Sequence, residues 1–217
     1  MPMTQDIPPR VLHIQKLNML SDQDMFNRYK AKQFEFEQDA DVSLLGHSLF
    51  DMWSDLPNYQ PILAGQRVAN MGLSGVSTYQ YLDIIVRPQR IRKLGKTVFV
   101  FLGVNDILKE IDYSPRQVTE WLAEIFALLQ QQSPDSRYFL LETAPVAATV
   151  NIDNREIRAL NDYVKNHLPP NVTFIETYQA FSDAEQNLAA NLTTDGVHFT
   201  AVGYDILSKL LTAHLTP

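Results

Sequence analysis

The chain of 217 residues is long enough for one domain with a sizeable core, since 45% of its residues are hydrophobic. Its formal net charge of -7 argues against binding to a nucleic-acid backbone, which needs clustered positive charge. The absence of cysteine excludes disulfides and thiolate catalysis. No secretory leader is recognisable, and no apolar run reaches the roughly 18 residues of a membrane span, so we expect a cytoplasmic protein.

The first forty residues differ in pattern from the rest. Residues 1–18 contain several prolines and predict an irregular arm, whereas residues 21–38 predict an amphipathic helix capped by Ser21. Its apolar face carries Met25, Phe26, Tyr29 and Phe36. This face would pack either on the chain's own sheet or on a partner, which leaves a homo-oligomer open. We therefore divide the chain into an N-terminal arm and helix, residues 1–40, and a main domain, residues 41–217.

From residue 42 onward, short apolar runs alternate with helical patterns. The runs lack strict polar alternation, as expected of strands buried on both faces, and lie at 42–46, 67–72, 97–103, 137–143 and 172–177. The predicted helices lie at 77–91, where Pro88 should cut the helix short, and at 114–132, 154–168 and 200–215. This alternation predicts a three-layer α/β/α domain around a five-stranded parallel sheet of the flavodoxin-like kind.

Four loops of this pattern are rich in polar residues and glycine. They read GHS at 46–48, NMGLSG at 70–75, GVND at 103–106 and DGVH at 195–198. Ligands of open parallel sheets bind at the carboxyl ends of the strands, so we expect the four loops to meet at that edge. Acyl transfer to water needs a nucleophile, a base, a group that orients the base, and donors to the oxyanion. Ser48 is the candidate nucleophile, His198 the candidate base and Asp195 its orienting carboxylate. The candidate oxyanion donors are the Ser48 and Gly72 amides and the Asn105 side chain.

The same four segments resemble the sequence blocks of the SGNH hydrolases, also called GDSL esterases and lipases. VSLLGHS is similar to the family's strand and Gly-Asp-Ser block, NMG to Asn-x-Gly, GVND to Gly-x-Asn-Asp and DGVH to Asp-x-x-His. The similarity runs from about residue 40 to 205. Length and N-terminal helix are also similar to bacterial relatives of the platelet-activating-factor acetylhydrolase catalytic subunits. The resemblance implies the SGNH hydrolase fold and the site just named, with Ser48, Asp195 and His198 as triad. It implies a serine esterase or acylhydrolase acting on a small-molecule ester, for which we expect a short, acetyl-type acyl group, no cofactor and no metal.

One position departs from the family pattern, because His47 stands where the family has Asp. His47 is a poor candidate for the base, since adjacent side chains of an extended segment point to opposite faces. Three alternatives remain: Ser48 serves only as a helix N-cap, the chain is a non-catalytic ligand-binding protein on this fold, or it is an α/β-hydrolase. The last is disfavoured by Phe50, because the Gly-x-Ser-x-Gly elbow needs glycine there. Asp106 is expected to bond nearby backbone rather than take part in chemistry.

Overall fold

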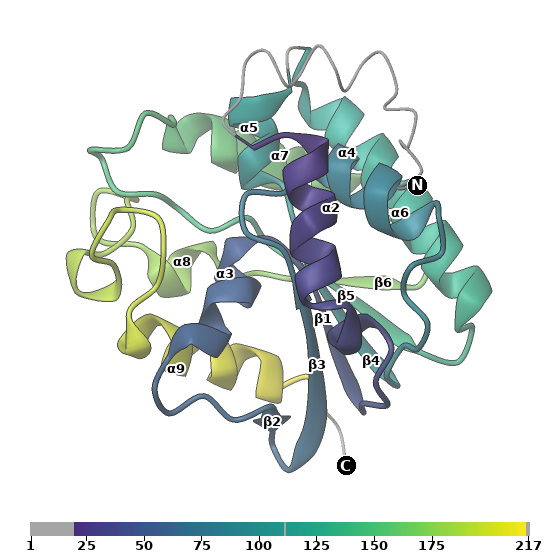
Figure 1. Ribbon diagram of the computed structural model, residues 1–217. Coiled ribbons are helices and arrows are strands. Elements are labelled where there is room, and N and C mark those ends of the chain that lie inside the picture. Colours follow the sequence, from purple (N-terminus) through teal and green to yellow (C-terminus); the bar gives the residue numbers. More distant parts are fainter. Residues whose placement is uncertain (1–19, 111, 216–217) are drawn as a thin grey trace.

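The computed structural model describes residues 20–110 and 112–215, so the predicted arm at residues 1–18 lies outside the described residues (Figure 1). A six-stranded sheet runs in the order β2-β3-β1-β4-β5-β6. Its strands are β1 (Val42–Gly46), β2 (Ile62–Leu63), β3 (Gln66–Gly72), β4 (Thr97–Phe101), β5 (Arg137–Leu141) and β6 (Val172–Ile175). Five are parallel, as predicted, whereas β2 pairs antiparallel with β3. With two residues, β2 is too short to show a period in the sequence.

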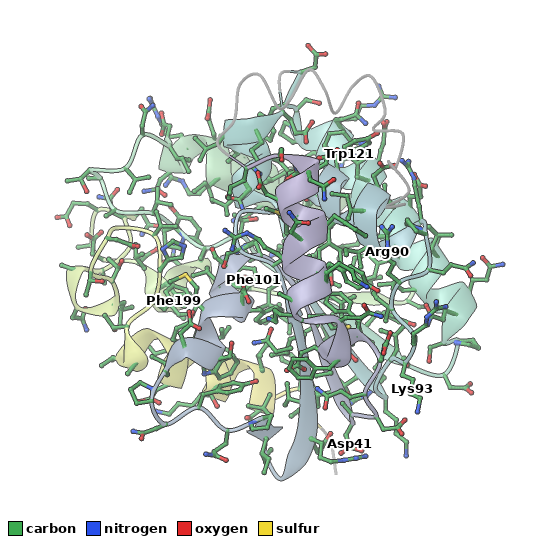
Figure 2. The ribbon with its side chains drawn as sticks, viewed as in Figure 1. Asp41, Arg90, Lys93, Phe101, Trp121 and Phe199 are labelled. Atoms are coloured by element: carbon green, nitrogen blue, oxygen red, sulfur yellow. The ribbon has the colours of Figure 1, made fainter. Side chains whose placement is uncertain are left out.

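Helices cover both faces of the sheet, which confirms the three-layer α/β prediction (Figure 1). One face packs against α2 (Asp22–Ala31), α4 (Thr78–Tyr81), α6 (Pro115–Gln132) and α7 (Asn154–Asn166), and the other against α3 (Ser48–Asp51), α8 (Tyr178–Phe181) and α9 (Ala201–Thr212). Successive strand residues supply the two cores in turn: Val100 belongs to the first and Phe101 to the second. In Figure 2, Phe101 and Phe199 accordingly lie on the side of α3 and α9, and Trp121 on the side of α6.

The N-terminal helix is shorter than the predicted range 21–38. Helix α2 ends at Ala31, and Gln33–Phe36 forms a 3-10 turn. Ser21 caps α2 as predicted, in a capping box with Asp24. Its apolar face packs on the chain's own core, where Met25 and Phe36 are fully buried, so the first of the two expected packing partners is the one observed.

The predicted helix 77–91 is only partly α-helical. Helix α4 continues as a π-helical segment, Leu82–Val86, in which the amide of Arg87 donates to the carbonyl of Leu82 five residues back. Pro88 has no amide hydrogen, so the helix does not extend through it. A further helix, α5 (Val104–Lys109), follows β4 directly. Within residues 20–110 and 112–215, no helix combines the length and apolarity that crossing a membrane requires.

Candidate active site

The nucleophile candidate sits where β1 turns into α3. Gly46, the last residue of β1, pairs in register with Gly72 of β3 and with Phe101 of β4. A Cβ on Gly46 would lie 2.3 Å from the Phe101 carbonyl oxygen, so a side chain there would force the strands apart. Ser48 begins α3 and is 7% exposed. The serine therefore lies at the carboxyl edge of the sheet, as the topology predicts for a site.

The N-cap of α3 is His47, because its Nδ1 accepts a hydrogen bond from the Leu49 amide at 3.3 Å. The alternative in which Ser48 serves as the cap is therefore wrong. The His47 ring is 1% exposed and lies against Phe101, with ring centroids 4.9 Å apart. Among the described residues its Nε2 has no hydrogen-bond partner. Burial, together with the neighbouring charge of His198, lowers the pKa of His47 to about 3, so the ring is neutral at ordinary pH.

A continuous chain of hydrogen bonds leads from Ser48 to Asp195. The Ser48 Oγ lies 3.0 Å from His198 Nε2, and His198 Nδ1 lies 2.6 Å from Asp195 Oδ2. The other carboxylate oxygen of Asp195 accepts the backbone amides of Val197 and His198. Partial burial opposes ionisation of Asp195, but these donors outweigh it and hold its pKa below the ordinary value. The structure thus brings the three predicted triad residues together, across 150 residues of sequence between Ser48 and His198.

One loop carries both Asp195 and His198. Gly196 within it has a φ of 89°, a conformation that L side chains rarely adopt, and this allows the tight turn. Thr200 caps α9 through the amide of Gly203, as expected, which leaves the His198 ring free to face Ser48. The side chains of His198 and Asp195 are 30% and 52% exposed, so a ligand can reach this end of the hydrogen-bond chain from solvent.

Two of the three candidate oxyanion donors, Gly72 and Asn105, already donate to acceptors within the protein. The Gly72 amide donates to Asn70 Oδ1 at 3.1 Å, and the Asn105 Nδ2 donates to the Val76 carbonyl at 3.0 Å. A primary amide has two N–H groups, so Asn105 keeps one for another acceptor. Gly72 has a single backbone N–H, and Asn70 Oδ1 already accepts it. Asn70 in turn donates to the Phe50 carbonyl of α3 at 2.6 Å. Gly72 is thus linked through Asn70 to α3, the helix that Ser48 begins, and Asn105 is linked to the loop after β3.

Asp106 forms hydrogen bonds to nearby backbone, as expected from the sequence. Both of its carboxylate oxygens accept the Thr78 amide at 3.0 Å, and one also accepts the Thr78 hydroxyl at 2.8 Å. These bonds tie the start of α5, which carries Asn105, to the start of α4. Burial, with a contribution from Glu110, raises the pKa of Asp106 to about 7. Within the described residues, no group of three or more metal-ligating side chains occurs.

The sequence analysis does not predict a polar cluster that lies against α3, the helix that begins at Ser48. Asp51 accepts hydrogen bonds from Lys32 at 2.7 Å and from the Ser74 amide at 2.8 Å, and Lys32 also donates to the Gly72 carbonyl. These residues come from α2's C-terminal end, from α3 and from the loop after β3. No spacing rule connects them, because their neighbourhood arises only when the sheet brings three distant segments together.

A model of the GDSL-like Lipase/Acylhydrolase family matches residues 44–206, a range that contains all five candidate site residues. The chain belongs to this family. The GDSL-like lipases and acylhydrolases are a family of hydrolases that act on ester bonds.

Two relatives of this GDSL-like acylhydrolase are both named N-acylneuraminate cytidylyltransferase. One, from Escherichia coli O18:K1:H7, is 32% identical over 187 residues, which cover 86% of this chain and 43% of the relative. The other, from Streptococcus agalactiae serotype III, is 28% identical over 205 residues, covering 82% and 49%. The chain thus spans less than half the length of each.

Solved structures share the fold. A protein provisionally named a platelet activating factor, from Streptococcus pneumonia, superposes with a TM-score of 0.75 at 21% identity, covering 94% of this chain and 99% of the other. A GDSL-like lipase from Bacteroides thetaiotaomicron superposes with a TM-score of 0.67 at 22% identity, covering 87% and 96%. At these identities the likeness concerns the fold.

Proposed function

We propose that this GDSL-like acylhydrolase is a serine esterase with Ser48 as nucleophile, His198 as general base and Asp195 as the group that orients His198. The observation that carries the proposal is the unbroken chain from Ser48 Oγ through both ring nitrogens of His198 to the Asp195 carboxylate. The distances suit proton transfer at Nε2, and the Asp195 contact keeps the other ring proton at Nδ1.

The proposed reaction has two halves. Ser48 Oγ attacks the ester carbonyl carbon while His198 Nε2 takes the serine proton, and the tetrahedral intermediate then collapses as His198 gives that proton to the leaving alcohol. Water next attacks the acyl-serine, His198 accepts a water proton, and the acid leaves as the proton returns to Ser48. Asp195 stays ionised and stabilises the imidazolium in both halves.

The proposed oxyanion hole consists of the Ser48 amide, the Gly72 amide and the second N–H of Asn105. For Gly72 to serve, its N–H must be shared between Asn70 Oδ1 and the substrate oxygen or move from one to the other. Asn105 needs no such exchange, because its bond to Val76 uses one of two N–H groups. Of these two donors, Asn105 is therefore the one that the arrangement favours.

For the substrate we propose a short acyl ester of a sugar hydroxyl, with acetyl as the first acyl group to test. Support comes from the relatives that match most of this chain, since their name refers to N-acylneuraminate, an acidic sugar with several hydroxyl groups. O-acetylated N-acylneuraminate, an acetylated neutral sugar and a lysophospholipid form the panel that separates sugar esters from lipid esters. A series of p-nitrophenyl esters with increasing acyl length tests the preference for short chains.

Covalent labelling tests the nucleophile directly. A fluorophosphonate probe should modify Ser48, as peptide mass spectrometry would locate, and Ser48→Ala should lose both labelling and p-nitrophenyl acetate hydrolysis while keeping its circular dichroism spectrum. Full hydrolysis by Ser48→Ala would refute the assignment. A folded wild-type protein that is neither labelled nor active would instead favour the non-catalytic binding protein.

A further inference from the structure

Lys32 connects the helix of the proposed nucleophile with the strand of a proposed oxyanion donor. Its Nζ donates to Asp51 Oδ1 at 2.7 Å and to the Gly72 carbonyl at 3.0 Å. Asp51 is the last residue of α3, the four-residue helix that Ser48 begins, and Gly72 is the last residue of β3. One ammonium group thus holds two elements whose spacing the proposed site needs to keep.

Both oxygens of the Asp51 carboxylate accept hydrogen bonds. Asp51 Oδ2 accepts both the amide and the hydroxyl of Ser74, at 2.8 and 2.6 Å, while Oδ1 accepts Lys32. Burial opposes ionisation of Asp51, but the Lys32 charge and the Ser74 donors outweigh it and hold its pKa below the ordinary value. The side chains of Lys32 and Asp51 are only 20% and 19% exposed, so solvent and salt screen this pair less than a surface pair.

Gly72 has little freedom to move relative to α3. A Cβ at this position would lie 2.5 Å from the Asp51 amide nitrogen, so the strand end and the helix are in backbone contact. The next amide, that of Leu73, donates to the Gly46 carbonyl at 2.8 Å. Lys32 and Gly46 therefore hold the two ends of the same peptide group: Lys32 binds the Gly72 carbonyl, and the Gly46 carbonyl, in the strand that leads to Ser48, accepts the Leu73 amide.

The anchor for Lys32 lies outside the region that the family model matches, which begins at residue 44. Lys32 is the C-cap of α2, and α2 is fixed to the core by Met25 and Tyr29. A second contact from the same segment reaches β3, because Glu35 accepts the Asn70 amide at 2.8 Å. This segment contacts strand β3, which carries the proposed oxyanion donor Gly72.

We infer that Lys32 is a positioning residue, which through Asp51 and the Gly72 carbonyl sets the placement of the Gly72 amide relative to Ser48. The inference rests on the proposed function, since it concerns the proposed nucleophile and oxyanion donor. Small misplacements at a reacting centre cost more in the transition state than in substrate binding. Loss of Lys32 should therefore lower kcat and leave KM nearly unchanged.

The test compares Lys32→Met with Lys93→Met. Lys93, labelled in Figure 2, forms an exposed pair with Asp39 at 2.8 Å and precedes the amino end of β4, whereas Gly72 is at the carboxyl end of β3. We expect Lys32→Met to lower kcat on p-nitrophenyl acetate by about 10- to 100-fold with KM within about two-fold. The affinity for an alkyl boronic acid, which mimics the tetrahedral intermediate, should fall by a similar factor. Lys93→Met should match the wild type in all three measurements.

Two further variants keep the inference falsifiable if Lys32→Met folds poorly. Lys32→Arg retains the cation and should keep more activity than Lys32→Met, and Lys32→Met combined with Asp51→Asn should lose less than the product of the single losses. A folded Lys32→Met whose kcat and boronic acid affinity stay within about two-fold of wild type would overturn the inference, whatever its melting temperature. An unlabelled, inactive wild type would instead overturn the proposed function, which the fluorophosphonate reaction at Ser48 reports separately.

Discussion

The imidazole of His47 accepts the backbone amide of Leu49, and so caps the helix that Ser48 begins. A histidine does here what the short acceptors Asp, Asn, Ser and Thr usually do at a helix start. Its neutral ring avoids placing a buried charge beside Ser48, but it leaves Nε2 without a partner among the described residues. An unpaired buried donor costs roughly 1–3 kcal/mol.

His47→Asp restores the residue found in the family pattern, and we expect it to keep the fold and to retain or raise activity. Aspartate is a good N-cap, and a negative charge is favourable at a helix N-terminus. Steady-state kinetics across pH check the activity. A large loss of activity with an intact fold would reveal a role for the imidazole itself.

The buried neutral His47 also predicts acid sensitivity. Below pH 6.5 the unfolded chain binds a proton at this histidine, whereas the folded ring, with a pKa of about 3, does not. The unfolded state then holds more protons, so the free energy of unfolding falls as pH drops from 6.5 toward 3, by about 1.4 kcal/mol per pH unit from this group.

Replacing His47 by Asn keeps a cap and removes the titration. Urea unfolding at pH 7, 6 and 5 should show a weaker pH dependence for His47→Asn than for the wild type, with a difference of about 2 kcal/mol accumulated at pH 5. His167→Asn, which alters an exposed ring at the end of α7, should follow the wild type. Parallel curves for His47→Asn and wild type would contradict a neutral buried His47.

The sequence predicts the parallel sheet and the neighbourhood of Ser48, Asp195 and His198, because short apolar runs define strands and strand ends share one edge. It does not predict His47 as the cap, since capping by a ring nitrogen depends on the exact turn after Gly46. Nor does it predict Lys32 beside Asp51, 19 residues away, because that contact depends on how α2 packs across the sheet. Periodicity describes each element separately, and these contacts arise between elements.

Asp195→Asn should separate the two tasks of this carboxylate. The amide oxygen can still accept the Val197 and His198 backbone amides, but its NH₂ would face His198 Nδ1 and favour the wrong ring tautomer. We expect kcat to fall by about 10³- to 10⁴-fold with a small change in melting temperature. Thr193→Val removes the bonds of the Thr193 hydroxyl to the Gly196 amide and to Asp195 Oδ1 but leaves the Asp195–His198 contact in place. This variant should keep most activity, so comparable losses in both variants would assign the effect to the loop.

Asn105→Ala should lower kcat by about 10²- to 10³-fold, the usual cost of one oxyanion donor. Single-turnover measurements of acylation would place this loss in the chemical step rather than in substrate binding. Asn161→Ala is the control for stability, because Asn161 is a buried amide bonded to the Thr143 backbone. Asn105→Ala with undiminished kcat would remove Asn105 from the proposed oxyanion hole.

The loop that carries Asp195 and His198 is closed on itself by a bridge between Thr193 and Phe199 and is attached to the neighbouring loop through the amide of Ala147. Asp195 and His198 would therefore move together if the loop shifted. Such a shift would lengthen the distance between His198 Nε2 and Ser48 Oγ and leave the Asp195–His198 contact intact. In such a shift the proposed nucleophile Ser48 would lose its contact with His198, while Asp195 would still hold the His198 ring. The distance between His198 Nε2 and Ser48 Oγ, 3.0 Å in this structure, would therefore report such a shift.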